Sequence, residues 1–251
     1  RWVMSTPLGM PVVPPVPRVA TTSWACAPCP PPARSPAAAP WFRPRAPPCR
    51  PVTPPTGIDA MVHAIEAYTS ALKKNPMSDL LAREALRLLA ANLDEAVHNG
   101  SNREARQAML LGACLAGQAF ANAPVAAVHA LAYPLGGNFH IPHGLSNALV
   151  LPQVLRFNVS AAATHYGELA PIVLGDRLRT DDPSTYAEQL IEEFEQMSAR
   201  MGLPTRLRDA GVPEELLPQL AKEAMLQQRL LVNNPREVTE ADALTIYRAA
   251  Y

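Results

Sequence analysis

Four side chains in this sequence have the types and spacing of ligands for a divalent transition metal. Asp59 and His63 lie four residues apart. Residues at that spacing share one face of an α-helix, so both can point at one ion from a single element. His129 and His143 follow later, fourteen residues apart. One carboxylate and three imidazoles complete the ligand set of such an ion. A metal held in this way polarises an alcohol or carbonyl oxygen, which favours a redox enzyme.

Each of these residues also has a simpler structural interpretation. A single histidine in an apolar helix, as at His129, most often bonds a neighbouring carbonyl group. His143 alone fits a solvated loop histidine. Glu66, one turn beyond His63, is either a group that supports the ligands or, more simply, a solvated helix carboxylate. The four candidate ligands together are far more specific than any one of them, because the combined spacing is rare.

The elements that must position these residues are helices. From residue 56 onward apolar residues recur at helical spacing, with no series of alternating strands and helices, so we predict an all-α, multi-helix bundle of about eight or nine helices. Ser78 is predicted to cap one helix, and Gly136 with Gly137 is predicted to form a loop between two others. The predicted helices cover residues 57–72, 78–98, 102–122, 125–133, 144–157, 161–173, 184–201, 214–230 and 239–250.

Residues 1–55 differ sharply from the rest of the chain. Residues 1–56 hold 17 of the 28 prolines and no acidic residue. Proline removes a backbone donor and fixes φ, so we predict an irregular Pro-rich segment over 1–55 and a helical, metal-binding catalytic domain over 56–251. Cys26 and Cys29 have the spacing of a metal or redox pair, but incidental cysteines are the favoured interpretation. A Pro-rich ligand for an SH3-type domain is a weaker alternative.

The whole composition excludes several classes of partner. Lys plus Arg and Asp plus Glu both number 22, so no net charge favours nucleic acid or an anionic membrane as a partner. The apolar stretch over about 108–135 is interrupted by polar residues, which indicates buried helices rather than a membrane span. No secretory signal is found, and four cysteines make no disulfide framework in a chain of this length. We therefore expect a cytoplasmic protein.

Two runs of this sequence strongly resemble signatures of the iron-containing (group III) alcohol dehydrogenase family. The first run is 57–68 (GIDAMVHAIEAY), and the second comprises 129–137 (HALAYPLGG) and 142–148 (PHGLSNA). The tail over 233–239 also resembles the end of that family. The resemblance covers about residue 46 to residue 251 and implies the C-terminal helical domain of a dehydroquinate synthase-like fold.

The resemblance implies an activity and a ligand set. Asp59, His63, His129 and His143 would hold Fe²⁺, or alternatively Zn²⁺. A small alcohol or aldehyde would exchange hydride with NAD or NADP. The protein would act on a small molecule, with a homodimer as an expected assembly. The alternatives are a non-catalytic metal-binding remnant and a relative of the maleylacetate reductase or glycerol dehydrogenase type.

The sequence departs from the family pattern at a position near the nicotinamide. The family usually has a histidine four residues after the third ligand, where this chain has Tyr133. Tyr133 either relays a proton or packs, and both interpretations stay open. His140 is a candidate to compensate, although a solvent-side loop histidine is the simpler interpretation. We take Tyr133 and His140 as the candidate catalytic residues.

The second departure concerns the nucleotide-binding domain that family members carry before the helical domain. Residues 1–56 contain one glycine, Gly9, and therefore no Gly-rich phosphate loop. We expect a truncated form that lacks the dinucleotide-binding domain. We also hypothesise that residues 24–50 are a frameshifted reading, which peptide masses over residues 20–45 would test.

Overall fold

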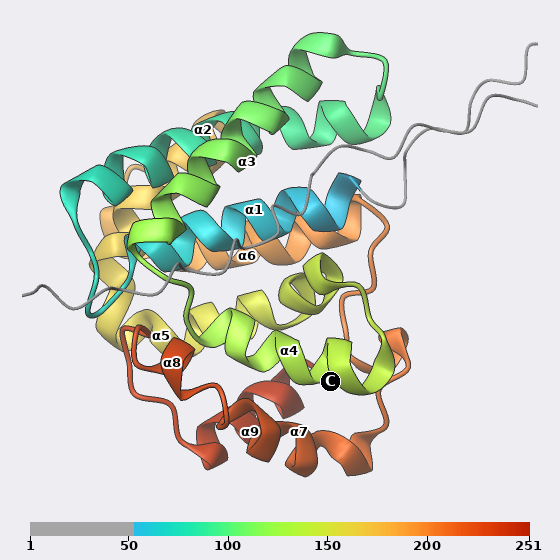
Figure 1. Ribbon diagram of the computed structural model, residues 1–251. Coiled ribbons are helices and arrows are strands. Elements are labelled where there is room, and N and C mark those ends of the chain that lie inside the picture. The colour runs from blue at the N-terminus through green and yellow to red at the C-terminus, as the bar shows by residue number, and fades with distance from the viewer. Residues whose placement is uncertain (1–52) are drawn as a thin grey trace, which may run out of the picture. The chain divides into compact units, whose positions relative to one another are not determined.

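The computed structural model describes residues 53–251, which form nine α-helices and no strand (Figure 1). The all-α prediction is therefore confirmed for these residues. The Pro-rich segment, the cysteine pair at Cys26 and Cys29, and the suspected frameshift over 24–50 lie outside them. The helices are α1 Thr53–Tyr68, α2 Pro76–His98, α3 Arg103–Asn122, α4 Ala127–Phe139, α5 His143–Leu174, α6 Tyr186–Arg200, α7 Leu217–Ala224, α8 Gln228–Leu231 and α9 Glu240–Ala249.

The starts of α1 and α2 are set by proline and asparagine. α1 begins at Thr53, earlier than predicted, because Pro54 and Pro55 occupy its first turn, where a missing N–H breaks no helical bond. α2 is capped by Asn75, whose side chain accepts a bond from the Ser78 amide at 2.9 Å. The prediction that Ser78 caps this helix is wrong. Its hydroxyl instead donates to the carbonyl of Ala119 at 3.0 Å and joins α2 to α3.

One predicted helix break is displaced, to residues 140–142, and another is absent. The glycines Gly136 and Gly137 lie inside α4, which continues to Phe139 and ends at His140 in the left-handed conformation (φ 54°). The helices predicted over 144–157 and 161–173 are one helix, α5, of 32 residues. Burial of α5 over most of its length explains the continuity, since tertiary packing overrides weak local signals. Conversely, the predicted helix over 214–230 is divided into α7 and α8.

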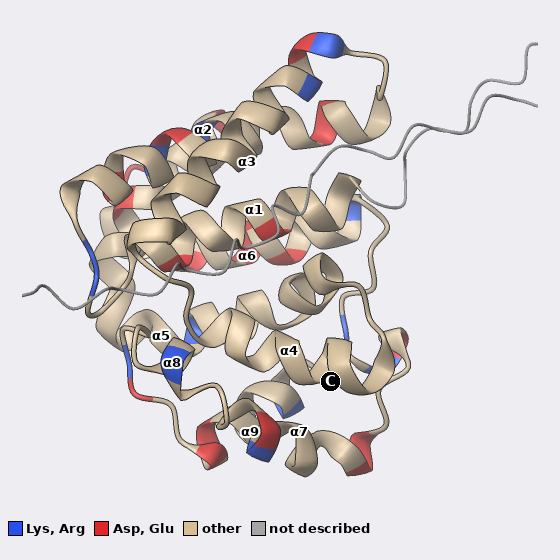
Figure 2. Cartoon of the chain, in the orientation of Figure 1, with Lys and Arg blue, Asp and Glu red and all other residues tan. Residues whose placement is uncertain are grey.

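Helix α1 lies at the centre of the fold. It packs against α2, α3 and α5, while α7 and α9 pack together against α4 and α5 (Figure 1). Ile58, Met61 and Ile65 are at most 1% exposed, and burying such a side chain contributes about 1.5–3 kcal/mol. α1 carries only two charged side chains, and both are buried acids (Figure 2). Buried charges in a core helix require partners, which directs attention to Asp59 and Glu66.

Among the described residues, no single helix is long and apolar enough to cross a membrane. Helices α3 and α4 reach the required length and apolarity only when they are taken together, and they are bent by 107° relative to each other. Most of α4 is buried in the fold, since eight of its first nine residues are buried.

Candidate metal centre

Three of the four predicted ligands meet at one point in the fold. Asp59 comes from α1, His129 from α4 and His143 from the first residue of α5. One ligand atom from each lies within 4.8 Å of the other two. The Asp59 Oδ1 atom is 3.7 Å from His129 Nε2 and 3.6 Å from His143 Nε2. Ligands about 2.1 Å from a tetrahedral ion would lie about 3.4 Å apart, so the spacing fits a metal with little rearrangement.

The fourth predicted ligand, His63, lies beside this group. Its Nδ1 donates to the backbone carbonyl of Asp59 at 2.8 Å, one turn earlier in α1. Its ring lies 4.5 Å from the His129 ring and 4.7 Å from that of Phe120, measured between centroids. The hydrogen bond on Nδ1 leaves Nε2 as the nitrogen with a free lone pair. The structure thus brings Asp59, His129 and His143 together and leaves His63 adjacent.

Glu66 supports His129 directly. Its Oε2 atom lies 2.6 Å from His129 Nδ1, and its Oε1 accepts a bond from the Val128 amide at 2.7 Å. Glu66 is 4% exposed, so the interpretation of a solvated carboxylate is wrong. The reason is tertiary, because Val128 and His129, at the start of α4, lie against this carboxylate. A carboxylate that holds the proton on Nδ1 directs the lone pair of Nε2 toward the metal position.

Asn147 is a member of the centre that the sequence did not single out. Its Nδ2 lies 2.5 Å from Asp59 Oδ1, 3.3 Å from His129 Nε2 and 3.2 Å from His143 Nε2. Three acceptors therefore face one NH₂ group with two hydrogens, while Oδ1 of the same amide has no hydrogen-bond partner. A signal was present, because Asn147 lies four residues after His143, the spacing that pairs Asp59 with His63.

The histidines differ in their affinity for a proton. Burial lowers the pKa of His63, and the neighbouring His129 lowers it further. Burial also lowers the pKa of His143, against the opposing charge of Asp59. Burial acts in the same direction on His129, but the charge and hydrogen bond of Glu66, together with Asp59, outweigh it and raise the pKa. His63 and His143 therefore favour the neutral form, which is the form that ligates a metal.

The donor set of this centre fits the metal that the sequence implies. A carboxylate oxygen and two imidazole nitrogens suit Fe²⁺ and Zn²⁺, whereas a shell of oxygens alone would suit Mg²⁺ or Ca²⁺. The lone pairs of Asp59, His129 and His143 already converge on a common donor, the Asn147 amide. We conclude that these residues could hold a transition metal, with His63 as the nearest further ligand.

The two predicted catalytic residues lie in different environments. Tyr133 is partly buried, and its ring centroid lies 5.9 Å from that of His143 and 6.4 Å from that of His129. His140 is exposed at the C-terminal end of α4. None of the hydrogen bonds or ring contacts found among residues 53–251 joins His140 to the three converging ligands. Tyr133 is therefore the one of the two that lines the centre.

Exposed apolar side chains do not gather around the converging ligands. His129 is 1% exposed, and Tyr133 and Phe139 pack against the core. In the described part of the chain, the large exposed apolar residues lie mainly on α2, α3 and the loops: Leu72, Met77, Leu80, Leu110, Leu111, Phe120, Leu226 and Val232.

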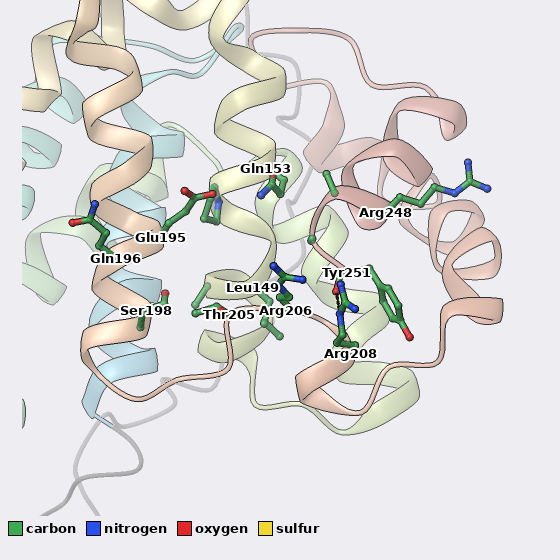
Figure 3. A pocket seen from close by; sticks show the side chains of 15 residues that line it. Leu149, Gln153, Glu195, Gln196, Ser198, Thr205, Arg206, Arg208, Arg248 and Tyr251 are labelled. Carbon is green, nitrogen blue, oxygen red and sulfur yellow. Dashed lines mark hydrogen bonds between the residues drawn. The ribbon is translucent and has the colours of Figure 1, made fainter.

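A separate open groove of about 490 Å³ lies between α5, α6 and the residues around Tyr251 (Figure 3). Arg206, Arg208 and Arg248 line it, together with Glu195. None of the converging ligands contributes to this groove. The groove is therefore distinct from the candidate metal centre.

The sequence matches a known family over the described residues. The family described as "Fe-containing alcohol dehydrogenase family, C-terminal" matches residues 53–251. Long-chain-alcohol dehydrogenase 1 of Geobacillus thermodenitrificans is 44% identical over 201 residues, which are 80% of this chain and 50% of that protein. A 1,3-propanediol dehydrogenase of Citrobacter freundii is 42% identical over 203 residues, 80% of this chain and 51% of that protein. The chain thus spans about half the length of these relatives.

Solved structures give the same result. A 1,3-propanediol oxidoreductase superposes with a TM-score of 0.74 and 40% identity, covering 78% of this chain and 51% of that one. An alcohol dehydrogenase from Oenococcus oeni superposes with a TM-score of 0.75 and 37% identity, covering 79% and 51%. The helical fold of residues 53–251 is therefore that of one half of these proteins.

Proposed function

The chain belongs to the iron-containing alcohol dehydrogenase family, and from this premise we propose that residues 53–251 supply the metal centre of an NAD(P)-dependent alcohol dehydrogenase. The observation that carries the proposal is the convergence of Asp59, His129 and His143 from three helices. The family membership and the names of the relatives support an alcohol as the substrate. Because the chain spans about half of those relatives, the activity of the whole protein is part of the proposal.

The proposed roles follow from the geometry. A bound Fe²⁺ or Zn²⁺ would lower the pKa of an alcohol, and NAD or NADP would accept its hydride. Asp59, 2% exposed, supplies buried negative charge at the centre. Glu66 keeps the proton of His129 on Nδ1. His63 is proposed as the fourth ligand, reached by reorientation of its ring.

Tyr133 is the proposed catalytic side chain of this domain. Its ring lies next to that of His143, which supports a role for its hydroxyl toward a substrate held at the centre. His140 is the less supported candidate, because it is exposed at the end of α4. A Tyr133→Phe variant distinguishes a proton relay from a packing role, because it removes only the hydroxyl and keeps the ring. An active enzyme whose turnover and pH profile are unchanged by this variant would assign Tyr133 to packing.

Metal content and nucleotide binding test the proposal together. The purified chain, loaded with Fe²⁺ without oxygen or with Zn²⁺, should retain one ion per chain after desalting. Calorimetry then measures NADH and NADPH binding, and absorbance follows the oxidation of short alcohols and diols. Metal retention without nucleotide binding would support the second candidate, a non-catalytic metal-binding domain. Failure to retain any metal would refute the proposed centre.

Assembly and location remain predictions. We propose a homodimer, which sedimentation velocity of the purified chain would detect. A cytoplasmic location agrees with a reduced iron centre, since oxidising compartments do not favour Fe²⁺. Fractionation of cells that express the protein tests this location.

A further inference from the structure

Asn147 connects the candidate ligands of three helices. It is 0% exposed in α5, one turn after His143. Its side-chain nitrogen contacts Asp59 on α1, His129 on α4 and His143 on its own helix. Among the hydrogen bonds of the described residues, no other side chain reaches all three of these residues. The amide is therefore placed to control how the three ligands are arranged.

The orientation of this amide follows from the ligands around it. An NH₂ group has two hydrogens, and here three acceptor atoms face it. The opposite orientation would place a carbonyl oxygen against a carboxylate oxygen and two imidazole lone pairs. The observed orientation avoids that repulsion, although it leaves Asn147 Oδ1 buried without a partner. A buried unpaired polar atom is unfavourable, so the interactions of the nitrogen determine the orientation.

We propose that Asn147 is a positioning residue of the metal centre. Its amide holds the lone pairs of Asp59, His129 and His143 together while no ion is bound, and it remains bonded to the Asp59 carboxylate when an ion takes the single Nε2 lone pair of each imidazole. The inference rests on the proposed metal centre. Asp59 is positioned most strongly by the amide, because its contact with Asn147 is the shortest of the three. Without the amide, the carboxylate and the two imidazoles lose their common donor and can turn away from one another. Metal binding then has to restore the arrangement.

Two substitutions in the full chain test the proposal. Asn147→Leu keeps a similar volume and removes the donor, and Asn147→Ala removes the whole amide. The matched control is Asn158→Leu, because Asn158 is also buried in α5 and exchanges two hydrogen bonds with Asn234, away from the metal centre. Competition with a chromophoric chelator measures the Kd for Zn²⁺. The absorption spectrum of bound Co²⁺ reports the coordination geometry.

We expect both Asn147 variants to raise the Kd for Zn²⁺ by about 10- to 100-fold, as the loss of groups that orient metal ligands usually does. The absorption spectrum of Co²⁺ bound to either Asn147 variant should also differ from that of the wild type. Asn158→Leu should lower the thermal stability and leave both metal readouts at the wild-type values. An unchanged Kd and spectrum in the Asn147 variants, or equal weakening by Asn158→Leu, would overturn the positioning role. If the wild-type chain binds neither ion, the metal centre itself is refuted and this inference with it.

Discussion

The Nδ1 atom of His129 lies 2.6 Å from Oε2 of Glu66, and this buried contact joins α4 to α1 beside the candidate metal centre. Glu66 also accepts the amide hydrogen of Val128. The carboxylate thus holds both the backbone and the ring of one candidate ligand. The contact determines which ring nitrogen of His129 carries the proton.

Glu66→Gln should weaken metal binding by about 10- to 100-fold. The glutamine oxygen can still accept the Val128 bond, but its NH₂ group then faces His129 Nδ1 and favours the proton on Nε2, where it blocks the ion. Chelator competition measures the effect. Glu193→Gln is the matched control, because Glu193, on α6, is equally buried but pairs with Arg177 and Arg200. Equal Kd values for the wild type and Glu66→Gln would contradict this role.

Asp59→Ala and His129→Ala should each abolish metal retention, because either change removes one of three converging ligand atoms. Metal analysis of the desalted protein measures the stoichiometry. His165→Ala is a suitable control, since this histidine lies in α5 near Tyr68 rather than at the centre. A full metal complement in Asp59→Ala or His129→Ala would remove that residue from the ligand set.

His63→Ala should raise the metal Kd without abolishing binding. His63 is adjacent to the three converging ligands, and Nδ1 of its ring is bonded to the Asp59 carbonyl. Three remaining ligands and a water molecule can complete a four-coordinate site. Titration with Co²⁺ shows both the weaker affinity and the altered spectrum. A loss as complete as in Asp59→Ala would show that His63 is required to the same degree as the converging ligands.

Gly144→Ala should destabilise the fold by about 1–3 kcal/mol, the usual range for overpacking. A Cβ atom at Gly144 would lie 2.3 Å from the Pro55 carbonyl oxygen, which is backbone of α1 and moves only with that helix. Gly167→Ala on the same helix meets nothing within 4 Å and should stabilise by about 1 kcal/mol through helix propensity. Urea unfolding measures both variants, and equal stabilities would disprove the close approach of α5 to α1.

His165→Gln should reduce the loss of stability on acidification. Burial lowers the pKa of His165, and Lys74 lowers it further. The unfolded chain then binds this proton more readily than the folded chain, so stability falls as the pH drops below about 6.5. His63 and His143 act in the same direction. The stability of the variant should therefore still fall on acidification, but by less than that of the wild type. Urea unfolding of the metal-free protein above and below that pH tests this, and an unchanged difference would argue against it.

Local sequence patterns were sufficient for the helices but not for all of their ends. Thr239 caps α9 with a complete capping box, as its residue type favours. The pair Gly136 and Gly137 also has local signals for a loop, yet it lies inside α4. Helix propensities are small compared with the energy of burial, so packing of α4 against the core decides that stretch.

The sequence by itself determined the all-α class, the family resemblance and the candidate ligands, because ligand types and helical spacing are local properties of the chain. Only the tertiary structure decided which ligands converge and what surrounds them. Glu66 and Asn147 lie 63 and 18 residues from His129 along the chain, and packing of α1, α4 and α5 brings all three together. Contacts between distant helices depend on how their buried faces fit, which no local pattern encodes.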